Sequence, residues 1–254
     1  MASSLKTTVI IPTFNRVELL GRAVDSLLRQ RDVADLDLLV VDDGSTDDTP
    51  RWLEHMSRTQ PAIRVVRQAN CGVAAARNTG LANLLPSTEL VTFLDSDDLS
   101  PPGRFAADLP RFASDQTLDL TYGKMMLVDR LNDDALAPAA GARSIEIVGI
   151  HLSAAILRRR VIDRVGMFDV EFRQAEDTDY LLRVFESGAR FAQTETLCLY
   201  YRRHADNMTR DTETARRSFA AAVLKSLRRR KANPQLTMNK PRFDVQALSE
   251  TGFF

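Results

Sequence analysis

The chain has 254 residues, and its 34 lysines and arginines balance 34 aspartates and glutamates, so the formal net charge is zero. With 44% hydrophobic and 27% charged residues, it can bury the core of a large domain, which argues against disorder. The balance disfavours a dedicated nucleic-acid binder, which carries a basic excess. No apolar run approaches the ~18 residues of a membrane span, and residues 1–6 lack a signal-peptide core. Because Cys71 and Cys198 have no partners at metal-binding spacing, we expect a cytoplasmic protein.

The first hundred residues alternate between β-branched runs and segments of helical periodicity. Strands are predicted at residues 7–11, 36–41, 63–66 and 90–94. Helices are predicted at residues 16–29, 46–56 and 72–85, the second starting at Thr46 or Asp47. Strands that alternate with helices indicate a parallel sheet covered on both faces, so the predicted fold class is α/β.

The pattern changes after residue 102. Strands are predicted at residues 118–128, 153–157 and 191–201, and helices at 176–187 and 215–231. Residues 132–143 form a connector rich in Ala, Pro, Gly and Asp, which is a candidate mobile lid.

Three polar clusters follow predicted strands directly, at residues 13–15 (TFN), 42–45 (DDGS) and 95–98 (DSDD). In open α/β sheets, ligands bind beyond the carboxyl ends of the strands. We therefore expect these three clusters to meet at one edge of the sheet and to form a binding site there.

The DSDD sequence at residues 95–98 places three carboxylates after an apolar strand. Such a cluster repels itself unless a cation is present, and a divalent metal with oxygen ligands fits it. The alternative is a solvated turn that caps the next segment. An EF-hand is excluded, because Leu99 and Ser100 stand where its loop needs a ligand and a glycine.

Other polar residues have both a structural and a functional interpretation. Asp43 either caps a turn or accepts hydrogen bonds from a nucleotide, and Arg77 lies one turn into an alanine-rich helix, within reach of a base or diphosphate. Asp177 lies in a first helical turn, where acidic residues are favoured in any case. His204 follows a strand, and a lone histidine is more often structural. Neither a GxxxxGK[ST] phosphate loop nor a GxGxxG fingerprint is present.

In their order and spacing, these motifs closely resemble those of the family 2 glycosyltransferases of the GT-A fold. The matching sequences, which cover residues 7–206, are VIIPTFNR (9–16), LVVDDGSTDDT (39–49), NCGVAAARNTGL (70–81), VTFLDSDD (91–98), VGMFDVEF (165–172), AEDTDYLLRV (175–184) and YYRRH (200–204). The resemblance implies an inverting, metal-dependent transfer of a sugar from a nucleotide-sugar, usually a UDP-sugar, to an acceptor nucleophile. The acceptor could be a glycan, a lipid-linked glycan, a peptide or a small molecule.

The resemblance also implies roles for individual residues. The donor-binding residues are Pro12, Thr13, Asn15, Asp43, Arg77, Asp95 and Ser96. Asp95 and Asp97 form the family's DxD motif, in which Asp97 is the expected direct ligand of Mn²⁺ or Mg²⁺, and His204 completes the metal site in some members. Asp177, in the ED motif, is the expected general base that takes the acceptor proton.

We predict a GT-A domain over residues 1–206, with a nucleotide-binding half (1–100) and an acceptor half (101–206). Residues 207–254 form a basic helical extension, which we call the tail. The tail has ten cations against four anions, hence +6, and −6 remains for the first 206 residues. The tail either packs back on the fold or contacts an acceptor or an anionic membrane. The sequence is also compatible with a homodimer.

Two other functions compete with a transferase. A haloacid-dehalogenase-type phosphatase also has a DxD after a strand, but its motif belongs to the first strand and is usually followed by Thr or Val where Leu99 stands here. A degenerate domain that only binds sugar nucleotides is the second alternative, and the presence of Asp95, Asp97 and Asp177 argues against it.

Overall fold

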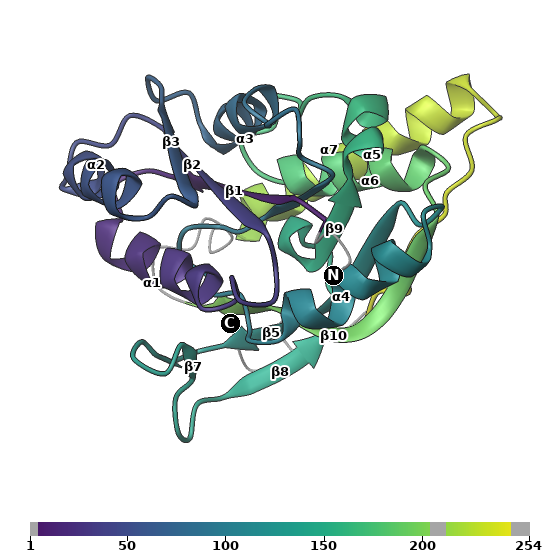
Figure 1. Ribbon diagram of the computed structural model, residues 1–254. Helices are drawn as coiled ribbons and strands as arrows, with labels where there is room; N and C mark the ends of the chain where they lie inside the picture. Colours follow the sequence, from purple (N-terminus) through teal and green to yellow (C-terminus); the bar gives the residue numbers. More distant parts are fainter. Residues whose placement is uncertain (1–4, 204–211, 245–254) are drawn as a thin grey trace.

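Four parallel strands form one half of a central sheet in the computed structural model, which describes residues 5–203 and 212–244 (Figure 1). They are β1 (Thr7–Thr13), β2 (Leu36–Asp42), β3 (Ile63–Arg67) and β4 (Leu90–Phe93), in the spatial order β4-β1-β2-β3. Every residue of β1, β2 and β4 is buried. This explains their nearly continuous apolar sequences, because strands covered on both faces do not alternate.

The other half of the sheet is mixed. It contains β5 (Leu120–Val128), β8 (Ser144–Ile147), β9 (Ala155–Arg158) and β10 (Phe191–Arg202). The strand β9 lies antiparallel between β4 and β5, β10 runs parallel to β5, and β8 pairs with β5. The strands β6 (Leu131–Asn132) and β7 (Ala137–Pro138) form a separate small hairpin. The predicted α/β class, with a mixed and mostly parallel sheet, is confirmed.

Helices cover both faces of the sheet. They are α1 (Val17–Leu28), α2 (Thr49–Thr59), α3 (Val73–Ala82), α4 (Arg104–Ser114), α5 (Arg159–Val165), α6 (Glu176–Glu186) and α7 (Thr212–Ala232). Apolar side chains of α1, α2 and α4 pack with Val9 and Ile11 of β1, whereas those of α3, α5 and α6 pack with Ile10. Alternate residues of one strand therefore belong to two cores. None of the helices in the described part of the chain is both long and apolar enough to cross a membrane.

The second half of the chain contains elements that the sequence analysis did not predict. The helix α4 contains Pro110, a residue normally excluded from helix interiors, and α5 was interpreted only as a basic stretch. The predicted strand at residues 153–157 starts two residues later, after a 3₁₀ turn at Leu152–Ala154. The predicted connector at residues 132–143 contains most of the β6–β7 hairpin.

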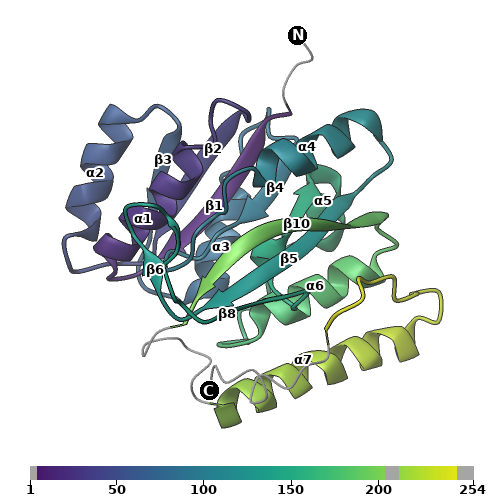
Figure 2. The ribbon, with the colours of Figure 1, turned by 90° about the horizontal axis from the view of Figure 1, so that it is seen from below.

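The tail helix α7 packs beside α6, and Figure 2 shows the two helices side by side. After α7 the chain returns to the sheet, where Phe243 packs edge-on against Tyr122 of β5. The Asn239 N–H donates to the Phe185 carbonyl, and the Asp244 N–H donates to the Val148 carbonyl. The described part of the tail therefore contributes to the same core as the rest of the fold.

Candidate active site

The loops after β1 and β2 form one hydrogen-bonded unit at the carboxyl edge of the sheet. The Asp43 N–H donates to the Thr13 carbonyl at 2.9 Å, and the Asn15 N–H donates to the Ser45 hydroxyl at 2.9 Å. The Asn15 side-chain oxygen accepts from the Thr46 N–H at 2.7 Å, with Asn15 itself in the left-handed region at φ 49°. Asparagine tolerates this conformation better than most residues. Two of the three predicted polar clusters thus lie together.

The predicted donor-binding residues differ in what they present to a ligand. Pro12 and Thr13 are buried in β1, although the Thr13 hydroxyl has no hydrogen-bond partner. Asn15 is exposed, and Ser96 is buried.

The Asp43 carboxylate holds the loop that leads into α3. It accepts from the Gln68 side chain at 2.7 Å, from the Cys71 N–H at 3.0 Å and from the Gly72 N–H at 2.8 Å. A carboxylate offers about four lone-pair positions, so these three donors leave room for about one more. A ligand that Asp43 binds would share the carboxylate with this loop.

Arg77 of α3 joins two separate parts of the site. It is 3% exposed, and its guanidinium binds Asp95 at 2.7 Å and Glu176 at 2.5 Å. Burial alone would lower the pKa of Arg77, but the surrounding carboxylates outweigh burial and raise it, so Arg77 stays charged. The sequence analysis assigned Arg77 to the nucleotide pocket, whereas in this structure its two terminal nitrogens bind the protein's own acids. The end of β4 is thereby linked to the start of α6.

Asp177 lies half-buried in the first turn of α6, directly after Glu176. Its carboxylate accepts from the Thr178 N–H at 2.6 Å. Burial raises its pKa, although the Arg77 charge and the Thr178 hydrogen bond lower it, and the Asp95 charge raises it further. Burial likewise raises the pKa of Glu176 to about 6, against the lowering effect of Arg77. A carboxylate with a raised pKa is a better proton acceptor, as a general base requires.

The loop that leads into α6 is fixed to α3 by Asn78. Its side-chain oxygen accepts from the Phe168 N–H at 2.7 Å, and its side-chain nitrogen donates to the Phe168 carbonyl at 2.9 Å. The Phe168 ring packs under the Arg77 guanidinium and stacks on Tyr180 of α6. Neighbouring residues of one motif, Arg77 and Asn78, thus position both the loop and the helix.

A potential metal-binding group lies at the third polar cluster. Ligand atoms of Asp95, Asp98 and His151 lie within 4.8 Å of one another. One Asp98 oxygen accepts from the Arg202 N–H at 2.9 Å, and the other is buried without a partner. Such an orphaned carboxylate oxygen beside Asp95 fits a hard divalent cation. Asp97, the expected direct ligand, is paired with Arg16 at 2.6 Å.

His151 has a geometry that suits a hydrogen-bond donor better than a metal ligand. Its Nδ1 accepts from the Ser153 N–H at 3.2 Å, so the neutral ring carries its proton on Nε2, which faces Asp95 at 3.8 Å. Burial lowers the pKa of His151 and so favours this neutral form. Metal-binding histidines normally donate, rather than accept, through the second nitrogen. The carboxylates therefore fit the ion better than this ring does.

The sequence analysis missed His151, and only its position before a short strand could have drawn attention to it. His204, predicted to complete the metal site, lies outside the described residues.

The geometry agrees with what comparisons of the whole chain show. The model of the family "Glycosyl transferase family 2" matches residues 8–133, about half of the chain. The chain belongs to glycosyltransferase family 2. It is similar to a chondroitin synthase of Pasteurella multocida (27% identity over 89% of this chain and 24% of the relative) and to the uncharacterized glycosyltransferase EpsJ of Bacillus subtilis (27% identity over 80% and 62%). The predicted enzyme class, a glycosyltransferase, is confirmed.

Solved structures support the GT-A fold. The mannosyltransferase PcManGT of Pyrobaculum calidifontis, in complex with GDP-Man and Mn²⁺, has a TM-score of 0.68 at 22% identity, with 89% of this chain and 65% of that chain covered. S. aureus TarS 1-349, in complex with UDP-GlcNAc, has a TM-score of 0.66 at 24% identity, with 86% and 66% covered. The family 2 chain therefore spans about two thirds of these structures, and much less of the chondroitin synthase.

Proposed function

We propose that this chain transfers a sugar from a nucleotide-sugar, expected to be a UDP-sugar, to an acceptor hydroxyl in a single inverting displacement. The observation that supports the proposal most is the Arg77 bridge, which joins Asp95 of the DxD motif to Glu176, the neighbour of Asp177. Donor-side acids and the acceptor-side base thereby belong to one site. Direct attack by the acceptor needs one base on the acceptor side, together with charge neutralisation on the leaving diphosphate.

In this mechanism Asp177 takes the proton from the acceptor oxygen as that oxygen attacks the sugar. The Thr178 N–H fixes one carboxylate oxygen of Asp177 and leaves the other free to accept. Asp95 and Asp98 fit a divalent ion, Mn²⁺ or Mg²⁺, and Asp97 would join them by giving up Arg16. The ion, when bound, neutralises negative charge on the departing nucleoside diphosphate. Arg77 holds the Asp95 carboxylate in place.

The donor part of the proposal is tested by calorimetry. We expect UDP to bind wild-type protein at least about tenfold more tightly with Mn²⁺ than without it, because an ion held by Asp95 and Asp98 would attract the negatively charged diphosphate. Asp95→Asn should lose this metal-dependent gain, whereas Asp134→Asn, a change of an exposed acid in the β6–β7 hairpin, should keep it. A phosphatase should show no metal-dependent affinity for UDP. A degenerate binding module would show the affinity without transfer.

We also propose that the outward face of α7 makes a peripheral contact with an anionic membrane on the cytoplasmic side. Leu224 and Leu227 are 53% and 48% exposed on this helix, and exposed basic residues surround them. The basic residues are Arg216, Arg217, Arg228 and Lys231. Exposed apolar side chains flanked by cations are typical of helices that lie in a membrane interface. Such a location would suit a glycan or lipid-linked acceptor, and relatives include a succinoglycan biosynthesis protein of Rhizobium meliloti.

Vesicle sedimentation tests this contact. We expect binding to phosphatidylcholine vesicles that contain phosphatidylglycerol, and at least about tenfold weaker binding by the Leu224→Ser/Leu227→Ser variant, since each leucine contributes about 1.5–3 kcal/mol when fully buried. High salt should weaken the binding of the wild-type protein. Equal binding by the variant and the wild type would contradict the proposal. A wild-type dimer that the same variant dissociates would instead assign the face to a second copy of the chain.

A further inference from the structure

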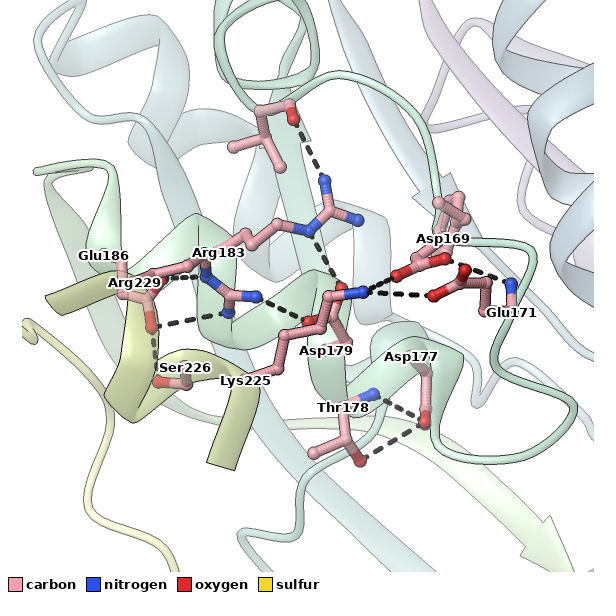
Figure 3. A network of polar contacts seen from close by, with 12 residues as sticks. Asp169, Glu171, Asp177, Thr178, Asp179, Arg183, Glu186, Lys225, Ser226 and Arg229 are labelled. Carbon is pink, nitrogen blue, oxygen red and sulfur yellow. Dashed lines mark hydrogen bonds and ion pairs between the residues drawn. The ribbon is translucent and has the colours of Figure 1, made fainter. Parts of the chain in front are cut away.

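A network of ion pairs with buried acids connects α6, which carries Asp177, to the tail helix α7 (Figure 3). Asp179 of α6 is 1% exposed and accepts from Arg183 at 3.0 Å and from Arg229 of α7 at 2.8 Å. Glu186, at the other end of α6, accepts from Arg229 at 2.7 Å and from the Ser226 hydroxyl. One arginine of α7 therefore binds two acids that lie seven residues apart on α6.

The apolar part of this helix contact is small. Ala222 and Ser226 are the buried residues among those described in α7, and neither has a large side chain. Lys225 adds an ion pair with Asp169, in the loop before α6. Small side chains allow one helix to slide or rotate against another. We therefore infer that the ionic contacts of α7, chiefly those of Arg229 and Lys225 with a longer one from Arg230 to Glu186 at 3.9 Å, set the register of α6 and α7.

Asp177 stands between two fixed neighbours in this arrangement. Arg77 holds Glu176 on one side, and Arg183 and Arg229 hold Asp179 on the other. Ala175, directly before this segment, has a left-handed backbone at φ 62°, which is uncommon for a residue other than glycine. Such a conformation persists only where the surroundings hold it, so the position of Asp177 depends on contacts made by its neighbours.

We propose that Arg229 is a positioning residue for the catalytic base. By binding Asp179 and Glu186 at once, its planar guanidinium fixes the rotation of α6 and so directs the Asp177 carboxylate toward the acceptor. A lysine has one ammonium group and cannot reproduce both contacts with the same geometry. This proposal rests on the assignment of Asp177 as general base.

The test measures hydrolysis of a sugar nucleotide, in which water replaces the acceptor. The probe is the most rapidly hydrolysed of UDP-glucose, UDP-galactose and UDP-GlcNAc. We expect Arg229→Lys to lower kcat about 10- to 100-fold, because small displacements of a reacting group have effects of that size, while the affinity for UDP with Mn²⁺ changes less than about twofold. Arg64→Lys is the matched control. Arg64 also binds a buried acid with two of its nitrogens, which donate to the Asp37 carboxylate at 2.7 and 2.8 Å, but it lies far from α6 in sequence.

A double-mutant cycle separates positioning from general destabilisation. Arg229→Lys should have little further effect when Asp177 is already Asn, since no base is left to misplace. An equal loss of kcat in both backgrounds, or a wild-type kcat for Arg229→Lys, would overturn the proposal. Should Arg229→Lys not fold, Glu186→Gln removes one of the two charged contacts and is judged by the same cycle. Full activity of Asp177→Asn alone would refute the base assignment instead.

Discussion

Replacing Asp177 by asparagine should abolish most sugar transfer while leaving the fold and donor binding intact. The amide is nearly isosteric with the carboxylate. Its oxygen can still accept from the Thr178 N–H, whose nitrogen lies 2.6 Å from the Asp177 carboxylate oxygen in the wild-type protein. It cannot accept the acceptor proton, however, and a positioned base is worth ~10²–10⁴-fold in rate. We therefore expect kcat to fall by about that factor, measured as the release of UDP from the donor, and the affinity for UDP with Mn²⁺ to stay near the wild-type value.

The control for this variant is Glu171→Gln. Glu171 precedes the same helix, and its side chain is 84% exposed. Its ion pair with Lys225, at 3.6 Å, only supplements the contact that Lys225 makes with Asp169, and the variant keeps that contact, so the loss of one charge at Glu171 should leave kcat unchanged. If Asp177→Asn turned over at the wild-type rate, a different residue would have to act as the base, and Glu176 would be the next candidate. Glu176 is buried and already paired with Arg77, so it is less accessible to an acceptor than the half-buried Asp177.

The nucleotide-binding half of the fold could be predicted because its signals are local. Strand and helix periods alternate cleanly up to residue 94, and the polar clusters mark the strand ends. The second half depends on contacts between residues far apart in sequence. The strand β9 was predicted only roughly, because its place between β4 and β5 is set by antiparallel pairing with both. The helix α4 was not predicted, because it contains Pro110, and proline normally argues against a helix interior.

In the candidate site, too, local motifs could be predicted from the sequence and contacts between distant residues could not. Asp95, Asp97 and Asp177 could be found from motifs, since each follows a strand or opens a helix. What could not be predicted is how charges pair across the fold. Arg77 lies 99 residues before Glu176, and nothing in either segment indicates that the two meet. His151 was missed for the same reason, because its relation to Asp95 exists only in three dimensions.

The opposite charges of the tail and of the preceding residues partly meet in the fold. The tail carries +6 and the preceding residues −6, and part of that balance consists of ion pairs within the fold. Lys225 and Arg229 neutralise Asp169, Asp179 and Glu186. Lys225 and Arg229 thus stabilise the fold. On the exposed side of α7, Arg217 pairs with Glu213, and Arg216, Arg228 and Lys231 face solvent.

Replacing Arg77 by methionine should have the largest effect on stability of any single change in the site. Methionine fills similar space but leaves Asp95 and Glu176 without their cation. Removing one partner of a buried ion pair costs about 3–5 kcal/mol, so we expect the free energy of unfolding at pH 7 to fall by about that amount. The measurement is urea unfolding of the metal-free protein, with Arg64→Met as the matched control at a partly exposed pair.

The effect of Arg77→Met should shrink as the pH is lowered. Burial raises the folded-state pKa of Glu176 to about 6 and raises that of Asp177, while Arg77 lowers both, so the variant should raise them further. A carboxyl whose folded pKa exceeds its unfolded value is most stabilising below the unfolded value, and that stability is lost as the pH rises through the folded pKa. Near pH 4.5 Glu176 is largely protonated when folded, so less buried negative charge is left unpaired than at pH 7. A difference from the wild type that stays constant between pH 7 and about 4.5 would show that Arg77 stabilises the site by packing instead of by charge.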